Sequence, residues 1–166
     1  ARLVSPVEAE LPLLGLGRSV GTGPEGIEAE VMVVRDFDEL AARAAEAPGK
    51  IVLFDPPWEN YGVNVKYRSQ GASAAAKAGA VACLIRPAGF GQNAPHTGVM
   101  HYDEGVARIP AAALTVEGAA RLRRLCERGR QPRVRLMMEA RTLDDGPCAN
   151  VFGELRGREH PEEIVL

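Results

Sequence analysis

The sequence predicts a layered α/β domain, and three observations support that prediction. Strand-like segments alternate with three helical segments along the 166 residues, as in folds that pack helices on a sheet. Residues 65–85 are typical of a helix that leads directly into a buried apolar strand. Within this helix, Gly71, Ala75 and Gly79 recur every fourth residue and form one stripe of very small side chains. Because such a stripe carries little apolar area, it favours a helix whose backbone lies close to a sheet.

The first part of the chain contains three predicted strands and one helix, separated by turn residues. The helix over residues 37–47 begins after Asp36, a good N-cap, and Glu39 completes a capping box. Pro48 and Gly49 end this helix. The strands cover residues 11–16, 27–34 and 50–54, and a loop rich in glycine and proline at 18–26 separates the first two.

The second part continues the alternation but contains a long irregular stretch. Residues 86–108 include four glycines and two prolines, so we expect a loop there. A strand over 109–114 precedes a helix that Thr115 caps and that ends at Gly129. Two further strands are predicted after this helix, over residues 133–139 and 149–155.

Composition argues against several classes of partner. The formal net charge is −2, so no overall field attracts nucleic acid or a membrane surface. No apolar run approaches the roughly 20 residues that a membrane span needs. Seven arginines between residues 121 and 135 have no aromatic residue among them, which favours a solvated helix face over a nucleic-acid site. The cysteines Cys83, Cys126 and Cys148 form neither a disulfide framework nor a zinc knuckle by spacing.

Several segments match a known family both in their residues and in their order along the chain. They are L-G-L-G-R-S-V-G-T-G-P-E-G-I-E-A-E-V (14–31), D-F-D-E-L (36–40), G-K-I-V-L (49–53), Y-R-S-Q-G-A-S-A-A-A-K-A-G-A (67–80), P-H-T-G (95–98) and I-P-A-A-A-L-T-V-E (109–117). Together they resemble the protease-associated domain of carboxypeptidase Q-like zinc metallopeptidases. The resemblance runs over nearly the whole chain.

This resemblance implies a three-layer β/β/α swivelling domain inserted into a peptidase. Residues 20–146 would form the protease-associated domain, and residues 1–19 and 147–166 would be strands of the peptidase core that flank it. The parent would be a secreted, lysosomal or periplasmic exopeptidase with two zinc ions, acting on dipeptides and short peptides as a homodimer. Because residues 163–166 begin an apolar strand pattern, we expect a segment of a longer protein, with a native edge strand as the alternative.

Two motifs suggest chemistry that their context does not support. His101 and Asp103 have a His-x-Asp spacing that suits zinc, and His96 lies nearby, but this stretch is an irregular loop without paired carboxylates. The glycines of residues 15–23 precede a strand, whereas a phosphate site needs a helix there. We therefore predict no metal site, no cofactor and no catalytic residue within this segment.

The remaining candidates are binding residues. As contacts to a substrate cleft we predict Arg18, Ser19, His96, Thr97 and His101, because long loops on a layered scaffold usually carry such contacts. Four aromatic residues are candidates for an interdomain or subunit interface, with core packing as an equal alternative: Trp58, Tyr61, Tyr67 and Phe90. Two functions stay open, namely an accessory domain of a zinc exopeptidase and a free-standing peptide- or protein-binding module. A third option, a zinc enzyme complete in itself, would require bound zinc at His96, His101 or Asp103.

Overall fold

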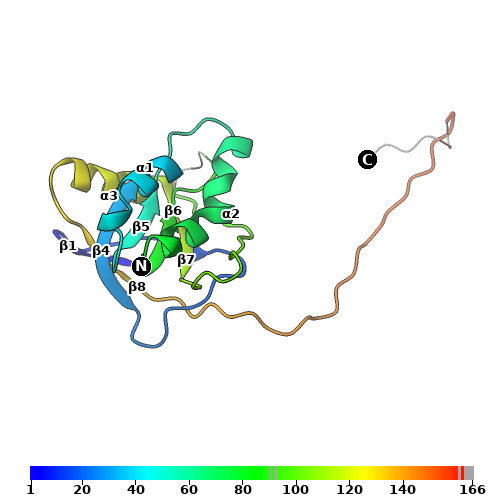
Figure 1. The fold of residues 1–166 in the computed structure, drawn as a ribbon. Helices are drawn as coiled ribbons and strands as arrows, with labels where there is room; N and C mark the ends of the chain where they lie inside the picture. The colour runs from blue at the N-terminus through cyan, green and yellow to red at the C-terminus, as the bar shows by residue number, and fades with distance from the viewer. Residues whose placement is uncertain (90, 92, 161, 163–166) are drawn as a thin grey trace.

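Eight strands and three α-helices form the fold in a computed structural model that describes residues 1–89, 91, 93–160 and 162 (Figure 1). The strands are β1 (Arg2–Ser5), β2 (Ala9–Glu10), β3 (Leu13–Gly15), β4 (Ile27–Val34), β5 (Ile51–Phe54), β6 (Ala82–Ile85), β7 (Ala111–Leu114) and β8 (Arg133–Leu136). The helices are α1 (Phe37–Ala42), α2 (Tyr61–Lys77) and α3 (Val116–Glu127), with a 3₁₀ turn, η1 (Ala44–Glu46), after α1. The strand order is β2-β1-β8-β4-β5-β6-β7-β3.

Strand β4 belongs to two portions of this curled sheet. Its first half, Ile27 to Glu30, pairs antiparallel with β8. Its second half, Val31 to Val34, pairs parallel with β5. β5, β6 and β7 continue this second portion in parallel, and β3 closes it antiparallel to β7. The sheet therefore bends along β4 into two layers.

The central strands are buried on both faces, and each face supplies its own core. In β5, Val52 and Phe54 point toward a cluster that includes Tyr67 of α2. Ile51 and Leu53 point the other way, toward a cluster that includes Leu3, Leu136 and Leu122. One core thus lies between the sheet and helices α1 and α2, and the other lies between the two sheet layers and includes residues of α3. The predicted α/β fold with β/β/α layering is confirmed.

Helix α2 lies close to the sheet, as the small residues predicted. A Cβ atom on Gly71 would come within 3.2 Å of the Phe54 ring and 3.4 Å of the Cys83 sulfur. Ala75 is fully buried on the same side. The prediction is wrong for Gly79, which lies beyond the helix C-cap with a φ of +83°, a conformation suited to glycine after a helix end.

The strand predicted over residues 149–155 does not form. Residues 141–160 are exposed and leave the domain as an extended tail (Figure 1). Val151 and Phe152 are 96% and 90% exposed, and no described strand pairs with this segment. A strand pattern needs a neighbouring strand to supply its hydrogen bonds, and the described part of the chain offers none here.

The first residues of the chain are part of the same sheet. β1 pairs with β8, and β3 pairs with β7. The division of the chain at residues 19 and 146 stays a prediction. Within the residues described, no helix has both the length and the apolar character needed to cross a membrane.

Candidate functional site

Two loops that are distant in sequence lie side by side and form a surface ridge, residues 15–19 with residues 97–101. Gly17 and Val99 form a parallel bridge. The Gly17 amide donates to the Gly98 carbonyl at 2.9 Å, and the Met100 amide donates to the Gly17 carbonyl at 3.1 Å. These backbone contacts hold most of the predicted cleft residues in one place.

Three of the predicted residues meet on this ridge. Arg18 Nη1 lies 3.1 Å from His101 Nδ1, and both side chains are exposed. Thr97 Oγ1 donates to the Gly15 carbonyl at 2.7 Å, so it links the two loops. Arg18 has a φ of +72°, which is uncommon for a residue with a side chain. His96 is exposed next to Thr97. The ridge therefore presents cationic and imidazole groups to solvent.

Ser19 has a different environment from its neighbour Arg18. It is only 4% exposed. Its hydroxyl accepts a hydrogen bond from the Ala111 amide at 2.8 Å and donates to the Val20 carbonyl at 2.9 Å. The hydroxyl thus ties the ridge to the start of β7, and its hydrogen bonds are directed to the protein's own backbone.

The His-x-Asp stretch is docked on helix α2. The buried Ser73 hydroxyl accepts from the Asp103 amide at 2.8 Å and donates to the His101 carbonyl at 3.4 Å. Lys77 Nζ lies 2.6 Å from Asp103 Oδ2, and this hydrogen bond lowers the pKa of the carboxyl. Asp103 is therefore engaged with a lysine. Among the described residues, no three His, Cys, Asp or Glu side chains are grouped so as to hold a metal ion.

Sequence reasoning missed two residues that support the ridge. Tyr102 donates through its hydroxyl to the Ile109 carbonyl at 2.6 Å and accepts from the Val20 amide at 3.1 Å. Arg68 donates to the Tyr61 hydroxyl at 2.8 Å, and its guanidinium lies against Gly98, where a Cβ atom would come within 2.6 Å of Cζ. Their partners are distant in sequence, so local spacing contains no signal for either contact.

The four aromatic candidates have different environments. Tyr67 is 5% exposed and its ring centroid lies 4.9 Å from that of Phe37, so core packing accounts for it. Tyr61 is 50% exposed, and Trp58 is half-buried. Phe90 lies outside the described residues. A role in an interface stays a prediction for Tyr61 and Trp58.

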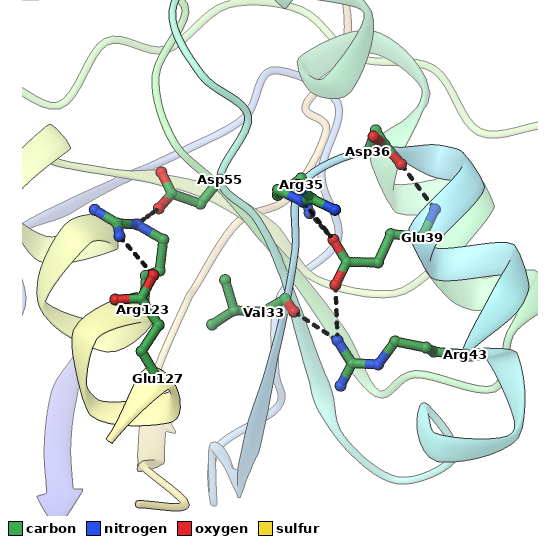
Figure 2. A network of polar contacts seen from close by, with 8 residues as sticks. All are labelled: Val33, Arg35, Asp36, Glu39, Arg43, Asp55, Arg123 and Glu127. Carbon is green, nitrogen blue, oxygen red and sulfur yellow. Dashed lines mark hydrogen bonds and ion pairs between the residues drawn. The ribbon is translucent and has the colours of Figure 1, made fainter. Parts of the chain in front are cut away.

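A second polar site lies at the carboxyl end of β5, where Asp55 is almost completely buried (Figure 2). Arg123 Nε donates to Asp55 Oδ2 at 2.9 Å, and Arg86 Nε lies 3.7 Å from Oδ1. Burial raises the pKa of Asp55, against the opposing charges of these two arginines. Arg123 also pairs with Glu127, so it is an exception to the solvated arginine face that the sequence predicts.

The chain is similar in sequence to known proteins, although no family model matches it. Carboxypeptidase Q of Pongo abelii is 48% identical and that of Homo sapiens 47% identical, each over 167 aligned positions covering 100% of this chain. The chain spans 35% of the length of either relative, or about a third.

Solved structures of peptidases also resemble this chain. A peptidase M28 precursor from Shewanella amazonensis SB2B is 33% identical with a TM-score of 0.78, over 82% of this chain and 33% of that one. A zinc aminopeptidase from Bacillus subtilis, BSAP, is 19% identical with a TM-score of 0.56, over 80% of this chain and 29% of its own, and shares the fold. The expected resemblance to carboxypeptidase Q is confirmed, and this chain is a homologue, over its whole length, of a segment of that protein.

Proposed function

We propose that this chain is the non-catalytic protease-associated segment of a zinc-dependent exopeptidase that acts on dipeptides and short peptides. The observation that supports this proposal most strongly is the alignment of the whole chain with about a third of carboxypeptidase Q. The two zinc ions and the groups that activate water would belong to the remainder of such a peptidase. The segment would shape or cover the entrance to the active site.

The ridge formed by residues 15–19 and 97–101 is the surface that we assign to the cleft. Arg18 and His101 present hydrogen-bond donors there, and an arginine forms strong charge-assisted hydrogen bonds with carboxylates. The ridge is built from loops that β3, β7 and α2 hold in place, the usual arrangement for binding residues on a rigid scaffold. In this arrangement the ridge would contact a peptide substrate and limit its length.

The same proposal extends to assembly and location. Exposed Tyr61 and half-buried Trp58 would contribute to an interface with the peptidase core or with a second subunit. The parent enzyme would act outside the cytoplasm, in a secreted, lysosomal or periplasmic setting. The partners of this segment would thus be the peptidase core and peptide substrates.

The test is steady-state kinetics of the full-length peptidase with Arg18→Ala and His101→Ala, using dipeptides and longer peptides. We expect kcat/KM to fall about tenfold to hundredfold, as for the loss of one hydrogen bond to a charged group. Arg124→Ala is the matched control, because Arg124 is exposed on α3. Unchanged kcat and KM in both ridge variants would show that this surface does not face the cleft.

A further inference from the structure

A groove of about 590 Å³ lies between α1 and α3, away from the ridge. Its floor is the second half of β4. Its walls come from Glu39, Arg43 and Glu46 on one side and from Arg123, Cys126 and Glu127 on the other. Figure 2 shows Val33 at the floor between the side chains of the two walls.

The floor of this groove is a strand edge that, among the described residues, side chains rather than another strand cover. β8 covers the outer edge of β4 as far as Glu30, and one further hydrogen bond joins the Val31 amide to the Pro132 carbonyl at 2.8 Å. The Asp55 amide donates to the Val34 carbonyl, so Val34 directs its backbone groups toward β5. Since successive residues of a strand alternate, Val33 and Arg35 direct their backbone groups into the groove.

Three side chains occupy the backbone groups of this edge. Arg43 Nη1 donates to the Val33 carbonyl at 3.2 Å, and the Arg35 amide donates to Glu39 Oε2 at 2.9 Å (Figure 2). Cys126 Sγ lies 4.0 Å from the Val31 carbonyl, a weak thiol contact. Each of these contacts comes from a rotatable side chain, so a stronger backbone partner can replace it.

The charge of Arg43 is neutralised independently of its contact with the strand. It also donates to Glu39 at 2.9 Å and to Glu46 at 2.8 Å. If the guanidinium moves away from the Val33 carbonyl, these two ion pairs still neutralise its charge. The carbonyl can therefore be exposed without leaving an unpaired cation.

We propose that the groove between α1 and α3 binds an extended peptide, which adds to β4 as a strand of about four residues. The floor presents backbone acceptors and donors at the spacing of a strand, and the matching ligand is another peptide backbone. The added strand continues the ladder that β8 begins on the same edge of β4. The inference does not depend on the proposed peptidase function.

The test titrates the ¹⁵N-labelled chain with a blocked peptide, acetyl-Val-Ser-Val-Ser-N-methylamide, and with two N-methylated isomers. One isomer carries methyl groups on both valine amides and the other on both serine amides, so each blocks one edge of the extended peptide. We expect shifts of the Val33 and Arg35 amide signals, and about a tenfold loss of affinity for one isomer only. Equal affinity of the two isomers, or no shift at these amides, would overturn strand addition.

A variant tests whether the peptide replaces Arg43 as the hydrogen-bond partner of the Val33 carbonyl. Arg43→Ala uncovers the Val33 carbonyl, so the parent peptide should bind about threefold to fivefold tighter. Arg124→Ala is the matched control on α3 and should bind as the unaltered chain does. Weaker binding by Arg43→Ala would instead mean that Arg43 holds the peptide directly, which contradicts displacement from the edge. Thermal unfolding of each variant confirms that it is folded.

Discussion

At the scale of single residues, Asp55 illustrates how one buried charge depends on its neighbours. The sequence places this residue at the end of a strand and places Arg123 in a run of solvent-facing arginines. The structure joins the buried Asp55 carboxylate to the partly exposed Arg123 guanidinium at 2.9 Å. A buried carboxylate needs such partners, because desolvation disfavours its charged form.

Removal of Arg123 should raise the pKa of Asp55 further. Burial already raises it above the ordinary value of 3.8, and Arg123 is the main opposing influence. An NMR titration of the Asp55 side-chain carbon should give a higher pKa in Arg123→Ala than in the unaltered chain. Arg124→Ala, whose side chain is exposed on the same helix, should leave the value unchanged. A lower pKa in Arg123→Ala would contradict the assigned contact.

The raised pKa of Asp55 also determines how its contribution to the free energy of unfolding changes with pH. In the folded chain Asp55 binds its proton more tightly than in the unfolded chain, so folding favours proton uptake. The contribution of Asp55 to the free energy of unfolding should therefore fall as the pH rises from about 3.8 through the raised folded pKa. Above that pKa its contribution no longer changes with pH.

At the scale of elements, the contact between α2 and the sheet depends on the absence of a side chain at Gly71. Phe54 is fully buried, and its ring packs against Phe37 and Tyr67 with centroids 5.2 and 5.6 Å away. The ring therefore has no room to retreat from a new methyl group. The small-residue stripe was readable from spacing alone, but the Phe54 ring that requires it was not.

Gly71→Ala should lower the free energy of unfolding by up to about 2 kcal/mol, because overpacking a core costs about 1–3 kcal/mol and the helix preference of alanine offsets up to about 1 kcal/mol of that cost. Chemical denaturation monitored by circular dichroism measures the change. Gly62→Ala is the control within the same helix, because Gly62 is exposed and alanine favours helix by up to about 1 kcal/mol. A Gly71→Ala chain as stable as the original would show that helix and sheet are less closely packed than described.

Docking of the 101–103 stretch on α2 gives a second prediction at this scale. Ser73→Ala leaves the Asp103 amide without its acceptor and should cost about 1–2 kcal/mol. Hydrogen exchange at the Asp103 amide should accelerate in parallel. Ser69→Ala is the matched control, because that hydroxyl donates only to carbonyls of its own helix, Val65 and Lys66. Equal exchange rates in the two variants would argue against Ser73 as the anchor.

At the scale of the whole molecule, local patterns predicted most elements but not how distant loops meet. Alternation and caps located β4, β5, β6, β7 and α3 to within a few residues. The ridge depends instead on the bridge between Gly17 and Val99, a pairing that neither segment encodes by itself. Likewise, the pattern of residues 149–155 predicts a strand, but a strand forms only where a partner is available.

The tail should be dispensable for the stability of the described domain. Residues 141–160 are exposed, whereas Met138 and the partly buried Ala140 pack against the core. A chain that ends at Arg141 should therefore keep its free energy of unfolding within about 0.5 kcal/mol, as for surface changes. Denaturant titration of both chains provides the comparison. A clear loss of cooperativity in the shorter chain would mean that the tail contributes contacts in solution.

The shared strand β4 has a consequence for how the polypeptide reaches its native arrangement. Its residues alternate between the two hydrophobic clusters, with Val31 in one and Met32 in the other. A slip of a single position against β5 would exchange these residues and misplace both clusters together. Correct alignment of this one segment during folding thus decides whether either half of the molecule can assemble.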